Sequence, residues 1–156
     1  MVDLSGASDF RSEFGLEGRK VEVNLSGASD FHADIEVDEA DLGLSGASSI
    51  HGRLDAGKAV IDLSGASDAF LEGMTDKLKI SSSGSSDIAR KAFGDRYALS
   101  CNQCEGSISG VSDAYIHCDD SINVSVSGAS GRHYTGNAST SGSHTSGGSS
   151  VVHDVL

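Results

Sequence analysis

"LSGASD" occupies Leu4–Asp9, and the same six letters return at Leu25–Asp30 and Leu63–Asp68, with "LSGASS" at Leu44–Ser49. Counted from the glycine of each tract, weaker copies continue along the chain at spacings of 21, 19, 19, 19, 26, 18 and 19 residues. A serine precedes each of these glycines, and another lies two residues after it. The glycines are Gly6, Gly27, Gly46, Gly65, Gly84, Gly110, Gly128 and Gly147. A unit of about 19 residues is too short to bury its own inner face, so the period indicates a stack of repeats.

The residues on either side of each glycine alternate between apolar and polar, which is typical of a strand with one buried face. In the second repeat the apolar positions are Val23 and Leu25 before the glycine and Phe31, Ala33 and Ile35 after it. Each repeat therefore predicts two short strands that meet at a Ser-Gly-x-Ser corner. Glycine suits a corner that needs a positive φ or a close approach of two backbones, and the serine hydroxyls can bond to backbone groups there or along the stack.

The period and the alternation together predict an all-β fold: a single-stranded parallel β-helix (β-solenoid) of about eight coils of about 19 residues, with residues 1–156 as a single domain. The chain contains no proline, which agrees with a fold in which nearly every backbone N–H donates to the adjacent coil. A β-sandwich of hairpins is the alternative, but hairpins favour Asn-Gly or Asp-Gly turns and impose no such register. The Ser/Gly/Thr-rich residues 137–150 are expected to form a last, weakly packed coil.

Charge and hydropathy narrow the classes of function. The chain has 11 lysines and arginines against 23 aspartates and glutamates, a formal charge of −12, which is the wrong sign for binding phosphate backbones or anionic lipid. No stretch approaches the roughly 20 apolar residues of a membrane-spanning helix. We therefore expect no nucleic-acid partner and no membrane span. The acidic surface either attracts cations and basic partners or simply keeps the protein in solution.

Five residues after each glycine, on the outward side, lies a column of cationic, imidazole and aromatic side chains of the kind that can hold a sugar ring or a peptide. A metal ion could also bridge His32 and His51, which fall on adjacent repeats. Isolated surface histidines and aromatic residues are common, so an incidental column is the alternative. The candidate ligand-binding residues are Arg11, His32, His51, Phe70, Tyr115 and His133.

Three residues after the glycine, most repeats carry an aspartate. Stacked carboxylates repel one another, and such a column can recruit cations such as Ca²⁺. The alternative, which we favour, is that each aspartate accepts a hydrogen bond from a backbone N–H at its corner, because the Gly-Gly-x-Gly-x-Asp pattern of calcium-binding repeats is absent. The candidate metal ligands are Asp9, Asp30, Asp68, Asp87 and Asp113.

The repeat between Gly84 and Gly110 is longer than the others and predicts an insertion near residues 89–102 that bulges from the rod. Insertions in repeat proteins often carry binding functions. This insertion holds a basic cluster on an acidic protein, which makes it a second candidate site, and a tolerated insertion without function is the equal alternative. Its candidate residues are Arg90, Lys91, Arg96 and Tyr97.

The three cysteines are Cys101, Cys104 and Cys118. A Cys-x-x-Cys spacing occurs in redox and zinc sites, but no second pair completes a zinc set. Cys104 and Cys118 fall on inward positions, so we expect buried free thiols that behave as small apolar residues. One disulfide, joining Cys104 to either of the other two, stays open if the protein is exported.

The recurrent SGASD tracts after an aliphatic strand, which extend from Val2 to Ser150, resemble the family of putative auto-transporter adhesins of the head GIN domain type. The resemblance implies a right-handed β-helix, export to the periplasm or surface of a bacterium, and no catalytic residues. The leader and N-terminal segment that usually precede such coils are absent before Met1. We therefore expect a leaderless form or C-terminal portion of an exported protein, with an open first coil through which a second copy can pair.

These observations predict a noncatalytic surface or periplasmic module for binding or adhesion, with a glycan or a protein as its ligand and no cofactor. A purely structural scaffold is one alternative. A polysaccharide-active enzyme is another, but it needs paired acids in a cleft, and Asp119 and Asp120 form the only adjacent aspartate pair. Ice binding ranks last, because the serine rows lie at corners rather than on a flat face.

Overall fold

The computed structural model describes residues 1–88 and 99–154 and places twelve strands in them. The strands are β1 (Val2–Leu4), β2 (Asp9–Arg11), β3 (Leu16–Leu25), β4 (Asp30–His32), β5 (Ile35–Leu44), β6 (Ser49–Leu63), β7 (Asp68–Ser82), β8 (Asp87–Ile88), β9 (Leu99–Ile108), β10 (Asp113–Val126), β11 (Gly131–Thr135) and β12 (Ser150–His153). Within these ranges, the protein has no helix that is long and apolar enough to cross a membrane.

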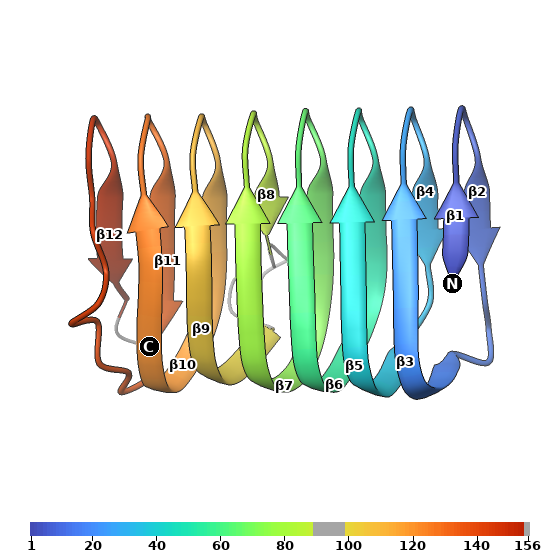
Figure 1. Cartoon of the computed structure of the whole chain (residues 1–156), viewed down its shortest axis with the longest axis horizontal. Coiled ribbons are helices and arrows are strands. Elements are labelled where there is room, and N and C mark those ends of the chain that lie inside the picture. Colours follow the sequence, from blue (N-terminus) through green and yellow to red (C-terminus); the bar gives the residue numbers. More distant parts are fainter. Residues whose placement is uncertain (89–98, 155–156) are drawn as a thin grey trace.

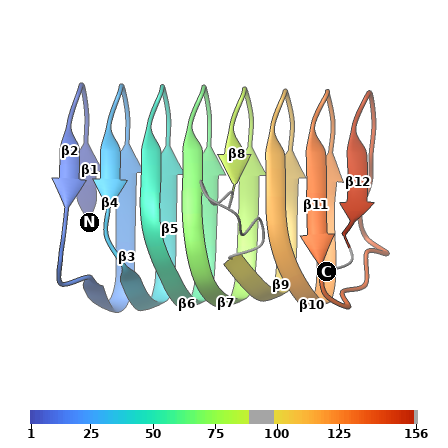
Figure 2. The same cartoon turned by 180° about the vertical axis from the view of Figure 1, so that it is seen from behind.

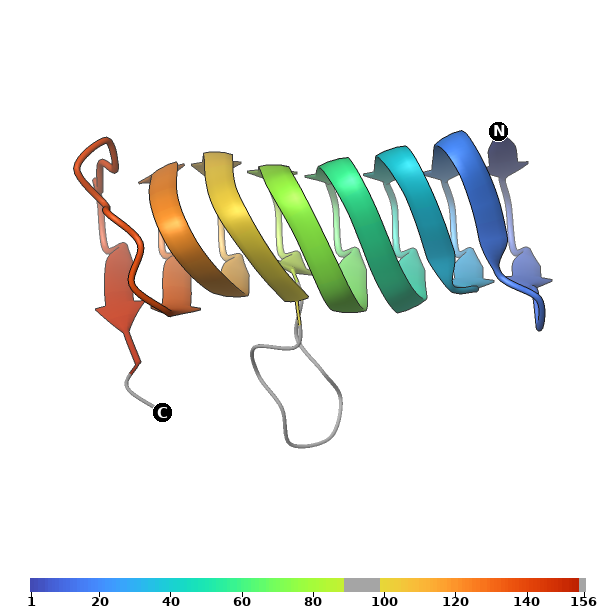
Figure 3. The same cartoon turned by 90° about the horizontal axis from the view of Figure 1, so that it is seen from below.

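The strands wind into a solenoid whose turns stack along one axis (Figure 1). The first face consists of β1 and the ends of β3, β5, β6, β7, β9 and β10. The second face, seen in front in Figure 2, consists of β2, β4, β8, β11, β12 and the beginnings of β6, β7 and β10. A curved bend joins the two faces (Figure 3).

All of the strand pairs are parallel, and the winding is right-handed. In Figure 1 the strands nearest the viewer run upward, those behind run downward, and the chain advances from right to left. This is the hand that parallel β connections almost always adopt. The expected right-handed parallel β-solenoid is therefore confirmed.

Residues one repeat apart stack on one another and form continuous columns. The inward column of Val23, Leu42, Ile61 and Ile80 runs in register through four strands, and all four side chains are fully buried. Burial of each such side chain stabilises the fold by about 1.5–3 kcal/mol. The core is thus a set of apolar columns along the axis of the rod, as the alternating pattern predicts.

The Ser-Gly corners stack as tightly as the repeat predicts. All eight corner glycines have φ between +73° and +88°, and a Cβ added to Gly46 would lie 2.4 Å from the carbonyl oxygen of Gly27. That oxygen accepts a hydrogen bond from the amide of Ala47 at 2.7 Å. The serine two residues after the corner glycine is buried, and its hydroxyl hydrogen-bonds to the backbone of the corner. Ser48 Oγ, for example, donates to the Ser45 carbonyl at 2.9 Å. The motif therefore satisfies the backbone where the chain reverses.

The number of turns and the end of the insertion differ from the expectation, whereas the last coil agrees with it. The eight corners enclose about seven full turns rather than eight. The strand β9 begins at Leu99, in register with Gly73, so residues 99–102 belong to the stack and not to the insertion; Leu99 and Cys101 alternate inward and are buried. Residues 137–150 form the expected loose coil, which is attached by the isolated bridges Ser121–Ser139 and Val126–Thr145.

Candidate functional site

The six residues predicted to bind a ligand form one column on the second face, here called the ring column: Arg11, His32, His51, Phe70, Tyr115 and His133. The first four pair in register across β2, β4, β6 and β7, and the last two pair across β10 and β11. All five rings are half-buried, and Arg11 is exposed. In sequence, position 89 falls between Phe70 and Tyr115 in this column and lies outside the described residues, so the described column consists of two stacks, one of four residues and one of two.

Neighbouring rings in the column are stacked face to face. The ring centroids of His32 and His51 are 4.6 Å apart at an interplanar angle of 8°, those of His51 and Phe70 4.6 Å at 13°, and those of Tyr115 and His133 4.7 Å at 12°. The spacing follows from the distance of about 4.8 Å between strands. Because the ring faces cover one another, the column presents ring edges to solvent.

This geometry decides what the column can bind. A sugar ring cannot stack on the middle rings, since each face is already covered by a neighbour. The nitrogen lone pairs of His32 and His51 lie in the planes of two nearly parallel rings whose centroids are 4.6 Å apart. Two such nitrogens do not converge on a single metal ion, which takes imidazole ligands at about 2.0–2.1 Å. The column as it stands offers hydrogen bonds rather than stacking or chelation.

Burial and neighbouring charges act on His51, at the centre of the column. Burial lowers the pKa of His51 below its usual value and the neighbouring His32 lowers it further, whereas Asp30 and Asp68 raise it. The neutral form of His51 is therefore favoured, and a neutral imidazole can both donate and accept hydrogen bonds. Nδ1 of His32 is buried and has no hydrogen-bond partner in the part of the chain that the structure describes.

Three of the five aspartates predicted as metal ligands accept hydrogen bonds. Oδ1 of Asp68 accepts the amide of Asp87 at 3.2 Å, and Oδ1 of Asp87 accepts the amide of Asp113 at 3.2 Å. Asp30 accepts a hydrogen bond from the hydroxyl of Ser49. Among residues 1–88 and 99–154, no three His, Cys, Asp or Glu side chains gather in a way that could hold a metal ion. The contacts of Asp68 and Asp87 support a backbone-capping role for these two residues, and Asp9 stands at the first position of the same column.

The second candidate site, made of Arg90, Lys91, Arg96 and Tyr97, lies outside the described residues. The three cysteines are buried free thiols, as expected. Hydrogen bonding with Cys104, together with burial, raises the pKa of Cys101, and hydrogen bonding with Cys101 and burial raise the pKa of Cys118. The thiolate is the reactive form of cysteine, so these two thiols are poor nucleophiles.

Arg132 is a buried cation that the sequence interpretation missed. Only 1% of the residue is exposed, and its Nη1 donates to Ser143 Oγ at 2.6 Å and to the Val124 carbonyl at 3.4 Å. Its guanidinium carbon lies 5.3 Å from the ring centroid of Tyr134, whereas Nε and Nη2 have no partner within the described ranges. Burial lowers its pKa. The repeat could have predicted its burial, because Arg132 falls four residues after Gly128, where earlier repeats carry an inward apolar side chain.

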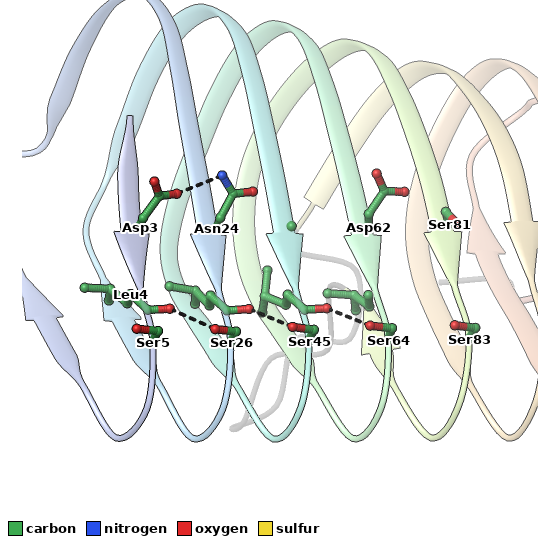
Figure 4. Close-up of a pocket in the computed structure, with 14 residues that line it drawn as sticks. Asp3, Leu4, Ser5, Asn24, Ser26, Ser45, Asp62, Ser64, Ser81 and Ser83 are labelled. Carbon is green, nitrogen blue, oxygen red and sulfur yellow. Dashed lines mark hydrogen bonds between the residues drawn. The ribbon is translucent and has the colours of Figure 1, made fainter.

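A groove of about 550 Å³ follows the first face along the first five corners (Figure 4). It is lined by a column of residues that precede the corner glycines by three: Asp3, Asn24, Gly43, Asp62 and Ser81. Asn24 Nδ2 donates to Asp3 Oδ1 at 2.9 Å, and on the serine rim Ser45 Oγ donates to the Leu25 carbonyl at 3.3 Å. The sequence interpretation missed this groove, because its middle opens where Gly43 has no side chain.

Neither a curated protein nor a solved structure matches the chain. The family model described as "Putative auto-transporter adhesin, head GIN domain" matches residues 1–138, which include the groove and the whole ring column. The resemblance indicated by the SGASD tracts is thereby confirmed. The family name describes an adhesin-like head domain, which implies an exported or surface location. By this match, which covers most of its length, the chain belongs to the family of putative auto-transporter adhesins with a head GIN domain.

Proposed function

We propose that the chain is a noncatalytic, exported module of the periplasm or cell surface that binds a glycan or a protein. The ring column carries the proposal, because four side chains able to contact a ligand lie in register on β2, β4, β6 and β7, and two more lie in register on β10 and β11 of the same stack. Membership of an adhesin-type family supports both export and binding. Strands that are already ordered lose little conformational entropy when a ligand binds, which favours recognition by such a surface.

The ligand is held through hydrogen bonds to the edges of the column. The imidazole edges of His32 and His51 and the guanidinium of Arg11 follow one another at the strand spacing of about 4.8 Å. The hydroxyls of a glycan, or the backbone groups of an extended peptide, complement such a row. Ring faces take part only at the ends of each stack, where no neighbouring ring covers them.

The acids of the groove support binding rather than hydrolysis. Asp3 and Asp62 are the two carboxylates in its lining, and they are three strand spacings apart in one column. This separation is about 14 Å at the usual strand distance. Glycoside hydrolysis requires two carboxyl groups about 5–9.5 Å apart. The pair is too widely separated for that chemistry.

The first turn is the proposed contact for a second copy of the chain. Within the described sheet, β1 pairs only with β3 and β2 pairs only with β4, which leaves one edge of each strand open. Open strand edges pair readily with another chain. Sedimentation over a wide range of protein concentration tests this contact: a monomer–dimer equilibrium is expected, and a monomer at every concentration would contradict it.

A glycan array, probed with and without Ca²⁺, tests the proposed function. The decisive variant is His32→Phe/His51→Phe, which keeps the stacked rings, as Phe70 does in the adjacent turn, but removes the polar edges. His144→Ala is the matched control, because His144 is exposed and lies outside the column. Binding by the wild type and the control, lost in the double variant, is the expected result.

The other outcomes each decide an alternative. Undiminished binding by the double variant would contradict the ring column as the site. Binding that requires Ca²⁺ would contradict the capping role of the aspartates and restore them as metal ligands. If the protein binds neither the glycans of the array nor surface proteins, the result would favour the structural scaffold.

A further inference from the structure

Three lysines gather around one pocket on the opposite side of the rod from the ring column. The pocket has a volume of about 310 Å³, and Lys58, Lys77 and Lys79 form one wall of it. They lie in the later halves of β6 and β7, which belong to the first face shown toward the viewer in Figure 1. The other wall comes from β9 and β10 and includes Gln103, Glu105, Ser121 and Asn123.

This gathering is unusual for so acidic a chain. The formal charge is −12, yet three of the four lysines in the described ranges line this pocket. Lys77 stacks between Lys58 and Gln103, so no carboxylate lies beside it in its column. None of the three lysines forms an ion pair with a carboxylate of the described residues. Adjacent like charges disfavour each other, and an anion placed between them removes that repulsion.

The opposite wall adds neutral hydrogen-bonding groups. Asn123 and Ser121 offer an amide and a hydroxyl, and Gln103 Nε2 is already held by Asp120 Oδ2 at 2.9 Å. Glu105 is the one acid in the lining, and it lies in register beside Lys79. The pocket thus combines ammonium groups that favour an anion with amide and hydroxyl groups that suit sugar hydroxyls.

We propose that this lysine pocket binds an acidic sugar, in which a carboxylate or sulfate group lies against Lys58, Lys77 and Lys79 and the ring hydroxyls contact Ser121 and Asn123. The volume is at the lower end of the range for small-molecule sites, about 300–1,000 Å³, which fits a single sugar unit. The site is separate from the ring column and does not depend on it.

Isothermal titration of the full chain with four probes tests this site: glucuronate, glucose 6-sulfate, glucose and inorganic sulfate. The two acidic sugars are expected to bind, more weakly as salt rises because screening weakens charge contacts, and glucose is expected not to bind. Lys77→Gln should weaken acidic-sugar binding by about tenfold, the scale of one lost charge-assisted hydrogen bond.

Lys20→Gln is the matched control, because Lys20 lies in the same column but outside the pocket, and Glu39 stands between it and Lys58. This control should bind like the wild type, and His32→Phe/His51→Phe should do so too, which separates this site from the ring column. The proposal is overturned if neither acidic sugar binds, if Lys77→Gln and Lys20→Gln bind alike, or if glucose binds as tightly as glucuronate. Equal affinity for inorganic sulfate and glucose 6-sulfate would also overturn it, since the sugar would then contribute nothing.

Discussion

The turns before residues 89–98 and the turns after them share their corners but not their interiors. In the earlier turns the amide of Ala47 donates to the Gly27 carbonyl at 2.7 Å, and in the later turns the amide of Val111 donates to the Gly84 carbonyl at the same distance. The buried hydrophobic residues of the earlier turns are aliphatic except for Phe31, whereas the later interior adds the three cysteines, Tyr134 and Arg132 to its aliphatic residues. The corner geometry is therefore the same in both regions, although the residues of their interiors differ.

The two regions therefore differ in the side-chain interactions that accompany the shared corner hydrogen bonds. In the earlier turns, apolar columns and corner hydrogen bonds act together. In the later turns the same corner hydrogen bonds act beside an interior in which Cys101 stacks on Thr75 and Cys104 on Leu78, and in which Arg132 is buried. A stack in which each turn contacts only its neighbours permits such local variation, because its stability is roughly a sum of contributions from each turn and each interface.

The largest expected effect comes from breaking the corner that both regions share. Gly46→Ala and Gly128→Ala place a Cβ 2.4 Å and 2.5 Å from the preceding glycine carbonyl, and each should lower the free energy of unfolding by about 2–5 kcal/mol, from backbone strain plus overpacking. Gly6→Ala is the control, since Gly6 has φ +77° but no atom within 4 Å of the added Cβ, and it should cost about 1–2 kcal/mol. Chemical denaturation measures all three.

If Gly128→Ala were as mild as Gly6→Ala while Gly46→Ala remained severe, the corner would not hold the later turns as it holds the earlier ones. The two regions would then not share the Ser-Gly corner as a common source of stability.

A smaller effect, of opposite sign, is expected inside the later turns. Arg132→Met removes a buried guanidinium whose Nε and Nη2 lack partners in the described part of the chain, and should raise the free energy of unfolding by about 1 kcal/mol after the loss of its hydrogen bonds. Arg53→Met is the control from the earlier turns, where an exposed arginine pairs with Asp55, and it should change stability by less than about 0.5 kcal/mol. A destabilised Arg132→Met would show that the arginine is required rather than tolerated.

The smallest effect is the contribution of His51, in the earlier turns, to the pH dependence of stability. The pKa of His51 is lowered in the folded state, mainly by burial and then by His32, so the folded chain binds fewer protons than the unfolded chain. The contribution of His51 is therefore complete above its unfolded pKa of about 6.5 and is lost as the pH falls below that value. Unfolding measured at pH 7.5 and at pH 5.5 should show this loss in the wild type and less of it in His51→Phe. Identical pH dependence in both would contradict the lowered pKa.

The fold was predictable because the repeat constrains the backbone directly. A glycine between two serines at a fixed period indicated a corner, and the alternation around it correctly placed side chains such as Leu42 and Ile61 inside. The insertion was placed too far toward the C-terminus, because the inward alternation of Leu99 and Cys101 was not extended back from the next corner.

The site was only partly predictable. The alternation placed His51 and Phe70 on the outward side of the solenoid. Whether another ring stacks on each of them depends on which residue occupies the same position one turn away. The groove depends on a missing side chain at Gly43, and the lysine pocket on the adjacency of Lys58 and Lys77 in register. These features depend on which residues of neighbouring turns lie side by side, so they were not recognised from the order of residues in the sequence.

Hydrogen exchange at the corner amides, followed by NMR, tests most directly the claim that one corner geometry holds both regions. Ala47, Val111 and Ala129 each donate to a glycine carbonyl of the preceding turn, at 2.7, 2.7 and 2.8 Å. We expect slow exchange of similar rate at all three amides, because none opens without separating two turns. Slow exchange at Ala47 beside fast exchange at Val111 and Ala129 would contradict it, since the later turns would then not be held by the shared corner.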